Sequence, residues 1–446
     1  MSHDLPRDSR FPRRSSLETV LSLVLCLAVA LGSMALIETD RRISKALIEI
    51  PIERGADEPR REETSTGAPP RLVCIVTLEG LRTDALVSAP RLRALAEGAV
   101  SFTTVGAQAT HPLVSLKSLL TGKYPSSLIL EETRADLVVL ATLESPSEFL
   151  ERTFRDVDGT LAACFGRAGY RTAAITDGGW VTADNGFATG FGTFEDSASD
   201  LFDAVRRATS RTKDLGSMPS LIYLHSRHLS GARDAEHYGD RLAELDQALG
   251  DWFDSLRTTG PWDESLLLVT GDFGQSLDER ELPGAGDLYL EQLLVPCVLK
   301  LPVGWRVASR VVQEPIELID VLPSLLAFSH RAAPADIDGA SFLPALLRGV
   351  RSKEFLVAQT TWTPAGASAA RRSVVDPGNW QVIHDAANSD VEFFLLSEDP
   401  TGRTSTTPTE DQAPAFVRRL LAGIEGEPGS PRNAGDSGGP AEARLR

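Results

Sequence analysis

Residues 71–80, RLVCIVTLEG, form the stretch that decides the fold. This apolar run with β-branched residues ends at a glycine, which is typical of a strand buried on both faces of a parallel sheet. Similar runs follow at residues 171–177, 220–226, 265–272 and 293–302. Amphipathic stretches at residues 89–99 and 241–258 predict helices between the strands. The alternation predicts an α/β fold, with a mixed, mainly parallel central sheet between helical layers.

The pattern changes after about Val350. Short strand-like segments follow, EFLVAQTTW at 354–362, WQVIHD at 380–385 and VEFFLL at 391–396, and then a helical segment at 414–424. We therefore expect an α/β domain at residues 71–350 and, at 351–424, a small antiparallel sheet with a helix beside it. Residues 425–446 are rich in glycine, proline and charge, which predicts a disordered tail.

An uncharged apolar segment lies near the N-terminus, at residues 20–37. Its length of about 18 residues is the lower limit for a helix that crosses a bilayer. We predict a cytoplasmic N-terminus at 1–16, an uncleaved single-pass transmembrane anchor at 17–38 and a polar stalk or linker at 39–70. Two alternatives stay open: a signal peptide cleaved after Ala30, and a helix buried in a soluble protein.

Basic residues flank this segment on both sides. Four arginines between residues 7 and 14 place the N-terminus in the cytoplasm by the positive-inside tendency, while Arg41, Arg42 and Lys45 act against it. With the N-terminus inside, the folded domain is extracytoplasmic, and periplasmic if the source is a Gram-negative bacterium.

The composition excludes some classes of function. A formal net charge of −17 argues against nucleic-acid binding, because a protein that binds a phosphate backbone needs a basic face. The four cysteines are too few for a disulfide scaffold in 446 residues, so plain buried thiols are expected.

Two acids follow predicted strands directly, Glu79 after the first and Asp272 after the run SLLLVT. Ligands of open α/β sheets gather at the carboxyl ends of strands, and paired carboxylates there can hold a hard divalent cation. Carboxylates at strand ends also act as helix N-caps, so both interpretations remain open at this point.

Several blocks of the chain resemble motifs of the sulfatase-like branch of the alkaline phosphatase superfamily. They are VTLEGLRTD (76–84), APRLRALAEGAVSFTTVGAQA (89–109), SLLTGKYPSS (118–127), GYRTAAIT (169–176), VTGDFG (269–274), LYLEQLLVPCVLKLP (288–302) and IDVLPSLLAFSHRAAPADIDGASFLPAL (319–346). Their order and spacing extend the resemblance over about residues 71–424. It implies the family's fold and a lineage that hydrolyses sulfate or phosphate esters.

The resemblance also implies which site positions are kept. Glu79 matches the first metal aspartate, Asp272 keeps a later one, and His225 keeps an expected histidine. The nucleophile, in relatives a cysteine matured to formylglycine or a serine or threonine, corresponds to Pro112. The other changed positions are Gly80 for a second acid, Leu116 for an arginine or histidine, Asp177 for a lysine, Gly179 for a histidine, Phe273 for an asparagine or histidine ligand, and Ala285 for a histidine. His228 could replace one lost histidine if its loop is shortened.

Sulfate-ester cleavage needs a nucleophile, a cation and donors to the leaving oxygen, and most of these are lost here. We expect no formylglycine and at most a weakly held divalent cation, Ca²⁺ or Mg²⁺, on Glu79 and Asp272. The catalytic candidates are His225, Ser115 and Lys117. In a rearranged site His111 would activate a hydroxyl and Lys117 would bind an anion; otherwise Ser115 is a helix-capping residue and Lys117 a solvated one.

Two hypotheses follow. The first is a membrane-anchored, extracytoplasmic pseudoenzyme that keeps the fold in order to bind an anionic glycan, a lipid head group or a partner protein. The second is a sulfuric or phosphoric ester hydrolase with a rearranged site.

Overall fold

The computed structural model describes residues 67–408, apart from 129–158, 233, 278, 280–283, 285, 351–352, 354, 361–370, 377–379 and 386–389. The predicted anchor at 17–38, the helix at 414–424 and the tail at 425–446 lie outside the described residues. Among the helices that the structure describes, none is long and apolar enough to cross a membrane.

An eight-stranded sheet forms the centre of the fold, in the order β5-β4-β6-β1-β7-β8-β2-β9. The strands are β1 Leu72–Leu78, β2 Val100–Phe102, β4 Arg171–Thr176, β5 Thr193–Glu195, β6 Ser220–Ser226, β7 Ser265–Gly271, β8 Cys297–Lys300 and β9 Val311–Val312. All neighbours pair in parallel except β8, which is antiparallel to both β7 and β2. The prediction of a mixed, mainly parallel sheet is confirmed, although the apolar run at 293–302 yields a strand only over Cys297–Lys300.

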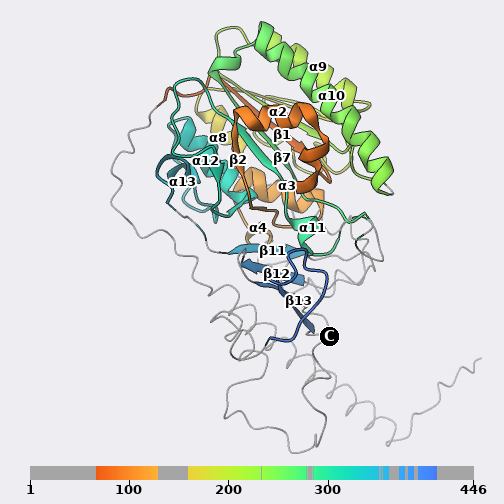
Figure 1. Ribbon diagram of the computed structural model, residues 1–446. Helices are drawn as coiled ribbons and strands as arrows, with labels where there is room; N and C mark the ends of the chain where they lie inside the picture. The colour runs from red at the N-terminus through yellow and green to blue at the C-terminus, as the bar shows by residue number, and fades with distance from the viewer. Residues whose placement is uncertain are drawn as a thin grey trace, which may run out of the picture. The chain divides into compact units, whose positions relative to one another are not determined.

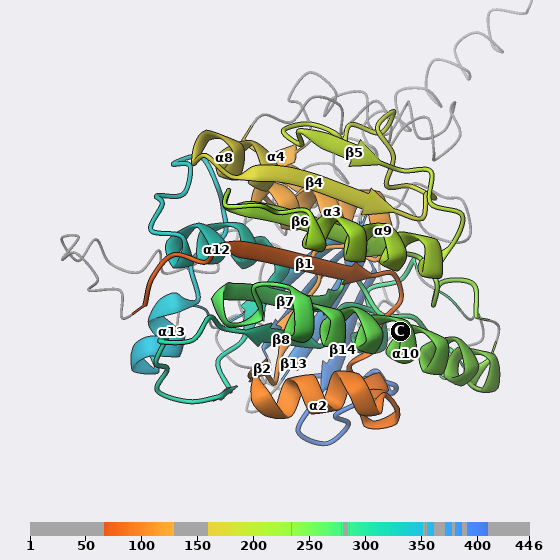
Figure 2. The ribbon, with the colours of Figure 1, turned by 90° about the horizontal axis from the view of Figure 1, so that it is seen from above.

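Helices cover both faces of this sheet (Figures 1 and 2). The helices are α2 Pro90–Gly98, α3 Pro112–Thr121, α4 Pro125–Leu128, α8 Leu161–Arg167, α9 Leu201–Lys213, α10 Ala235–Thr259, α11 Leu290–Leu293, α12 Val321–Phe328 and α13 Leu343–Arg348, with 3-10 turns at Thr83–Ser88, Trp262–Glu264 and Leu318–Asp320. Val73 and Ile75 of β1 join the core under α3, α8 and α12, while Leu72 and Cys74 join the core under α2, α9 and α10. Both faces of β1 are therefore buried, which explains its unbroken apolar sequence.

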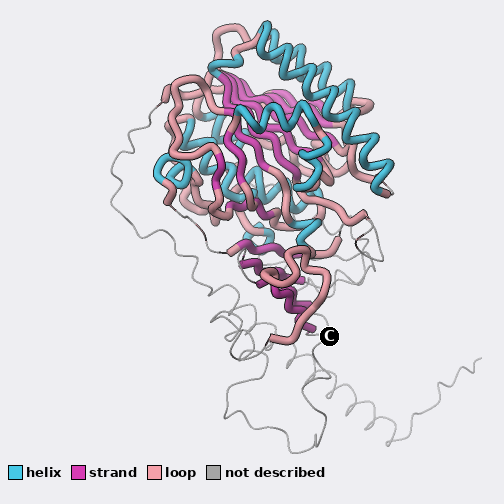
Figure 3. Tube along the Cα trace, in the orientation of Figure 1, coloured by secondary structure: helices cyan, strands magenta, loops and turns pink. Residues whose placement is uncertain are grey.

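A second, antiparallel sheet contains the strands β11 Leu356–Thr360, β12 Arg371–Asp376, β13 Trp380–Asp385 and β14 Asp390–Leu395 (Figure 3). Its existence was predicted, but β12 was missed because it begins with two arginines. β3 Val105–Gly106 and β10 Ile316–Glu317 form a short parallel pair of their own. Strand β11 of the second sheet contacts β3 of this pair.

Helix α3 matters most for the site. It begins at Pro112, whose ring fixes the φ angle that a first helical residue needs, and it ends at Thr121, where Gly122 follows as a cap in the left-handed conformation at φ 68°. All ten residues of α3 are buried. Polar side chains on this helix therefore have no direct access to solvent.

Candidate functional site

Three parallel strands bring the candidate site together. In the order β6-β1-β7, Thr77 lies opposite both His225 and Thr270, so the three strands end level with one another. Glu79 follows the last residue of β1, and Asp272 follows the last residue of β7. His225 is the penultimate residue of β6. Parallel register thus places all three side chains at one edge of the sheet.

The ligand atoms of Glu79, His225 and Asp272 all lie within 4.8 Å of one another, and His225 Nε2 is 3.9 Å from Glu79 Oε2. His225 and Asp272 are fully buried, and the Glu79 side chain is 12% exposed. Ligand atoms that each lie about 2.0–2.5 Å from one ion are at most about 5 Å apart. The spacing therefore fits a shared cation.

Two buried atoms of this cluster lack partners. Asp272 Oδ1 accepts hydrogen bonds from the backbone N–H groups of Phe273 at 2.8 Å and Gly80 at 3.4 Å. Asp272 Oδ2 and His225 Nε2, by contrast, have no hydrogen-bond partner among the described residues. An unsatisfied buried polar atom costs about 1–3 kcal/mol, so each calls for an explanation, and a bound ion would satisfy both of these atoms.

The Nδ1 atom of the His225 ring contacts a neighbouring hydroxyl, on the side of the ring away from Nε2. Its Nδ1 lies 3.0 Å from Thr77 Oγ1, which lies 2.8 Å from the hydroxyl of Tyr223. When Nδ1 carries the proton and donates it to Thr77, the lone pair of Nε2 points toward the two carboxylates. A partner on the second ring nitrogen is what orients a metal-binding histidine.

Mutual charge controls protonation in the cluster. Burial opposes protonation of His225, but its interaction with Glu79 and the charges of Asp272 and Asp177 outweigh burial and raise its pKa above the ordinary value. Burial and the nearby charge of Glu79 raise the pKa of Asp272. Two carboxylates this close repel each other, and a positive charge between them removes that repulsion.

The nucleophile position offers no nucleophile. Pro112 is the first residue of α3, and one turn later Ser115 donates its hydroxyl to the backbone oxygen of Asp272 at 2.5 Å. Ser115 is fully buried and lies inside the helix, so its predicted role as a helix cap is wrong. The helix N-cap is His111, whose side chain makes no capping hydrogen bond.

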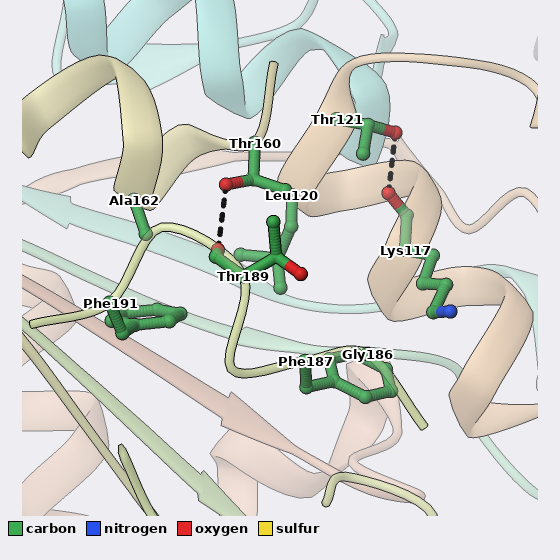
Figure 4. Close-up of a pocket in the computed structure, with 9 residues that line it drawn as sticks. All are labelled: Lys117, Leu120, Thr121, Thr160, Ala162, Gly186, Phe187, Thr189 and Phe191. Atoms are coloured by element: carbon green, nitrogen blue, oxygen red, sulfur yellow. Dashed lines mark hydrogen bonds between the residues drawn. The ribbon is translucent and has the colours of Figure 1, made fainter. Parts of the chain in front are cut away.

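Lys117 is not solvated, contrary to the prediction, because α3 is buried on all sides. It is 5% exposed, and its Nζ lies 5.7 Å from the centre of the Phe187 ring. Figure 4 shows both side chains beside a small cavity that Thr160 and Thr189 also line. That cavity has a volume of about 20 Å³, which is room for roughly one water molecule.

Burial makes His111 a weak base. Its ring packs edge to face against Trp180, with 4.8 Å between the ring centres. Burial lowers its pKa to about 4, so the ring is neutral near pH 7.

At the positions where the family's site residues are replaced, the residues of this chain make contacts within the fold. Asp177 accepts hydrogen bonds from Ser226 Oγ at 2.6 Å and from the backbone N–H of Arg227 at 3.0 Å. Gly80 and Gly179 both have positive φ, at 82° and 71°. A Cβ at Gly80 would lie 3.0 Å from Gln275 Oε1, so the side chain of Gln275 takes the space of the missing second acid.

The remaining sequence candidates lie elsewhere. His228 Nε2 pairs with Glu244 Oε2 at 2.9 Å and is not part of the three-residue cluster. Phe273 is buried in the core on the α3 face, and Ala285 lies outside the described residues. Sequence reasoning singled out Glu79, Asp272 and His225, but it missed that His225 converges with the two carboxylates in one cluster. It also missed Thr77, which has no sequence signal beyond its place in β1.

Comparison with known proteins agrees with this arrangement. The family model described as Sulfatase matches residues 181–330. The multifunctional alkaline phosphatase superfamily protein PehA of Trinickia caryophylli is 34% identical over 176 residues, which cover 36% of this chain and 34% of PehA. The matched segments span about a quarter to a third of the curated relatives' length.

Solved structures match over much more of the chain. A putative sulfatase from Bacteroides thetaiotaomicron superposes with a TM-score of 0.63 at 14% identity, covering 80% of this chain and 91% of that one. A phosphonate monoester hydrolase from Silicibacter pomeroyi gives 0.60 at 16% identity, covering 79% and 94%. At this level of identity the likeness establishes the fold.

Proposed function

Because this chain is a member of the sulfatase-like family within the alkaline phosphatase superfamily, we propose that it binds a divalent cation at Glu79, His225 and Asp272 and does not hydrolyse esters. In this proposal the protein is a pseudoenzyme that keeps the family's fold for binding. Hydrolysis of a sulfuric or phosphoric ester through a rearranged site is the alternative to be tested.

The donor set supports the cation. Two carboxylates and one imidazole converge, and two of their buried atoms, Asp272 Oδ2 and His225 Nε2, lack hydrogen-bond partners among the described residues. Carboxylates suit Ca²⁺, Mg²⁺ and Mn²⁺, while an imidazole ligand shifts preference toward Mn²⁺ and Zn²⁺. A bound cation would attract the anionic oxygens of a sulfate or phosphate group.

The proposal of inactivity rests mainly on the residues at the start of α3. Its first residue is Pro112, and the nearest hydroxyl along the helix, on Ser115, already donates to the backbone of Asp272. Losing a nucleophile together with cationic donors leaves little beyond binding, since each such group contributes about 100-fold or more to the rate.

Replacing Pro112 with serine should therefore not create a hydrolase. Beside the new hydroxyl, at the start of α3, the His111 ring packs on Trp180, and its pKa of about 4 makes it a weak base. The measurement is turnover of 4-nitrophenyl sulfate and 4-nitrophenyl phosphate with Mn²⁺, Zn²⁺ or Ca²⁺ present. Activity of Pro112→Ser above that of Pro112→Ala would contradict the account.

The location and the ligand belong to the same proposal. We propose a membrane anchor at residues 17–38 and an extracytoplasmic folded domain that binds an anionic glycan, a lipid head group or a partner protein. The full-length protein should then resist extraction from membranes by alkaline carbonate. Recovery of mature protein that begins near Leu31 and is free in solution would instead mean that the segment is a cleaved signal.

A further inference from the structure

We propose that a groove beside helix α9 binds a small ligand that carries two phosphate or sulfate groups. The groove has a volume of about 420 Å³, and side chains of α9 and of the strands β4, β5 and β6 contribute to its lining. Ligand pockets usually have volumes of about 300–1,000 Å³, so the groove is large enough. This is a second site, and it does not rest on the proposed cation.

The groove lies where the helical layer stops short of the sheet edge. β5 is the edge strand, next to β4 (Figure 2), and α9 packs on β6 and β4. On β4, Ile175 joins the core on the α9 side, and the alternation of a strand places Ala173 and Arg171 on the same face. Ala173 is small and only partly buried, and Arg171 is exposed. The helix therefore leaves this part of the face uncovered.

The groove is distinct from the candidate cation cluster. Arg171 begins β4 and pairs with Ser220, the first residue of β6. Glu79, His225 and Asp272 lie at or just after the other ends of their strands. Arg171 and the cluster are therefore at opposite edges of the sheet.

Positive charge is concentrated in the groove. Four arginines and two acids are among its lining residues, whereas the whole chain has a net charge of −17. A third acid, Asp203, pairs with two of these arginines. The arginines are Arg171, Arg206, Arg207 and Arg211, and the lining acids are Glu195 and Asp214. A basic groove on an acidic protein favours an anionic ligand.

Two of the arginines are held in place. Arg207 Nη1 and Arg211 Nη2 both donate to the Glu195 carboxylate, at 3.2 and 2.6 Å. These bonds tie α9 to β5. Arg207 also donates to Asp203 at 3.1 Å, so its role is to hold the groove together. Arg211 keeps Nη1 for a ligand, because its bonds to Glu195 use Nε and Nη2.

Donors face the groove from two sides. On the sheet side, the Arg171 guanidinium has no hydrogen-bond or ion-pair partner among the described residues. On the helix side, Arg206 is 75% exposed and lies five residues before Arg211, about 7.5 Å along the helix. One phosphate or sulfate group can bond one guanidinium fork well, so donors this far apart fit a ligand with two such groups.

Larger or more apolar ligands fit the groove less well. Its apolar lining residues are Ala173, Leu215, Leu221 and Ile222, which are too few to cover an acyl chain. A stable protein partner usually buries about 800 Å² on each side, which needs a broader surface than this groove.

The test titrates the full chain by calorimetry, at low ionic strength, with pyrophosphate and separately with a disulfated disaccharide. At least one of them should bind with a Kd below about 1 mM, and the tighter one distinguishes a phosphate from a sulfate ligand. Inorganic phosphate should bind about 10-fold more weakly than pyrophosphate, because one group cannot reach both sides of the groove.

Arg171→Gln and Arg211→Gln should each weaken binding of the tighter probe by about 10-fold or more, because each removes a charge-assisted hydrogen bond. Lys213→Gln is the matched control, because Lys213 is an exposed cation on the same helix and does not line the groove. It should change the affinity less than about threefold. Unchanged thermal unfolding midpoints would show that all three variants are folded.

Asp272→Asn should bind the probe as the unsubstituted protein does, because the cation cluster lies at the other edge of the sheet. Loss of binding in Asp272→Asn would place the anion at that cluster and overturn the proposal. Binding of neither probe, or equal affinities in Arg171→Gln, Arg211→Gln and the unsubstituted protein, would overturn it as well. None of these results depends on whether the protein binds a cation.

Discussion

Replacing Asp272 with asparagine should raise the Mn²⁺ Kd by more than about 100-fold. Loss of a residue that merely supports a ligand costs about 10- to 100-fold, and removing the charge of a ligand should cost more. The substitution keeps size and leaves Oδ1 able to accept from Phe273, so the fold should survive. Calorimetric titration with Mn²⁺, together with a thermal unfolding midpoint close to that of the unsubstituted protein, provides the measurement.

Asp246→Asn is the matched control. Asp246 is also a buried aspartate, but its two oxygens accept from the backbone N–H groups of Arg91 and Leu92, at 3.0 and 2.8 Å. Its replacement should leave Mn²⁺ binding unchanged. Thr77→Val should give an intermediate loss, about 10- to 100-fold, because His225 loses its support but not its nitrogen. Unchanged Mn²⁺ affinity in Asp272→Asn would exclude this cluster as the cation site.

Replacing Lys353 with alanine should lower the free energy of unfolding by about 3–5 kcal/mol. Lys353 is buried between Glu317 and Asp320, both fully buried, and bonds Glu317 Oε2 and, at 2.8 Å, Asp320 Oδ1. Glu317 also accepts from the hydroxyl of Tyr124 at 2.7 Å and from the backbone N–H of Val357 at the start of the second sheet. Removing the ammonium leaves two buried carboxylates without their counter-charge. Urea unfolding followed by tryptophan fluorescence measures the loss.

Lys123→Ala is the matched control for that experiment. Lys123 also pairs with one carboxylate, on Asp336 at 2.7 Å, but the Asp336 side chain is 75% exposed. An exposed ion pair contributes at most about 1 kcal/mol, so Lys123→Ala should shift the urea midpoint little. Equal shifts for the two variants would mean that the buried cluster stabilises the fold no more than the exposed ion pair does.

The central part of the fold could be predicted because its signals are local. β1, β6 and β7 are apolar on both faces, and that pattern is visible in the sequence alone. β12 could not be predicted in the same way. Its first residue, Arg371, is neutralised by Asp287 and Glu392, which are distant in sequence and become neighbours only after folding.

The site was only partly predictable for the same reason. Glu79 and Asp272 follow strands, and strand ends are where ligands bind, so sequence reasoning could select them. The approach of His225 to both carboxylates depends on the register of three strands, which no local pattern specifies. Lys117 was predicted to be solvated because a lysine in a helix usually is. That prediction failed because every other face of α3 is also buried.

Cation content and ester turnover should be measured together on one preparation of the full-length protein. After equilibration with Mn²⁺, Zn²⁺ or Ca²⁺ and removal of excess ion, the account predicts a stoichiometric bound cation that Asp272→Asn loses. It predicts no turnover of 4-nitrophenyl sulfate or 4-nitrophenyl phosphate above the buffer rate. Turnover that disappears in both Asp272→Asn and Ser115→Ala would contradict the account and establish a hydrolase with a rearranged site.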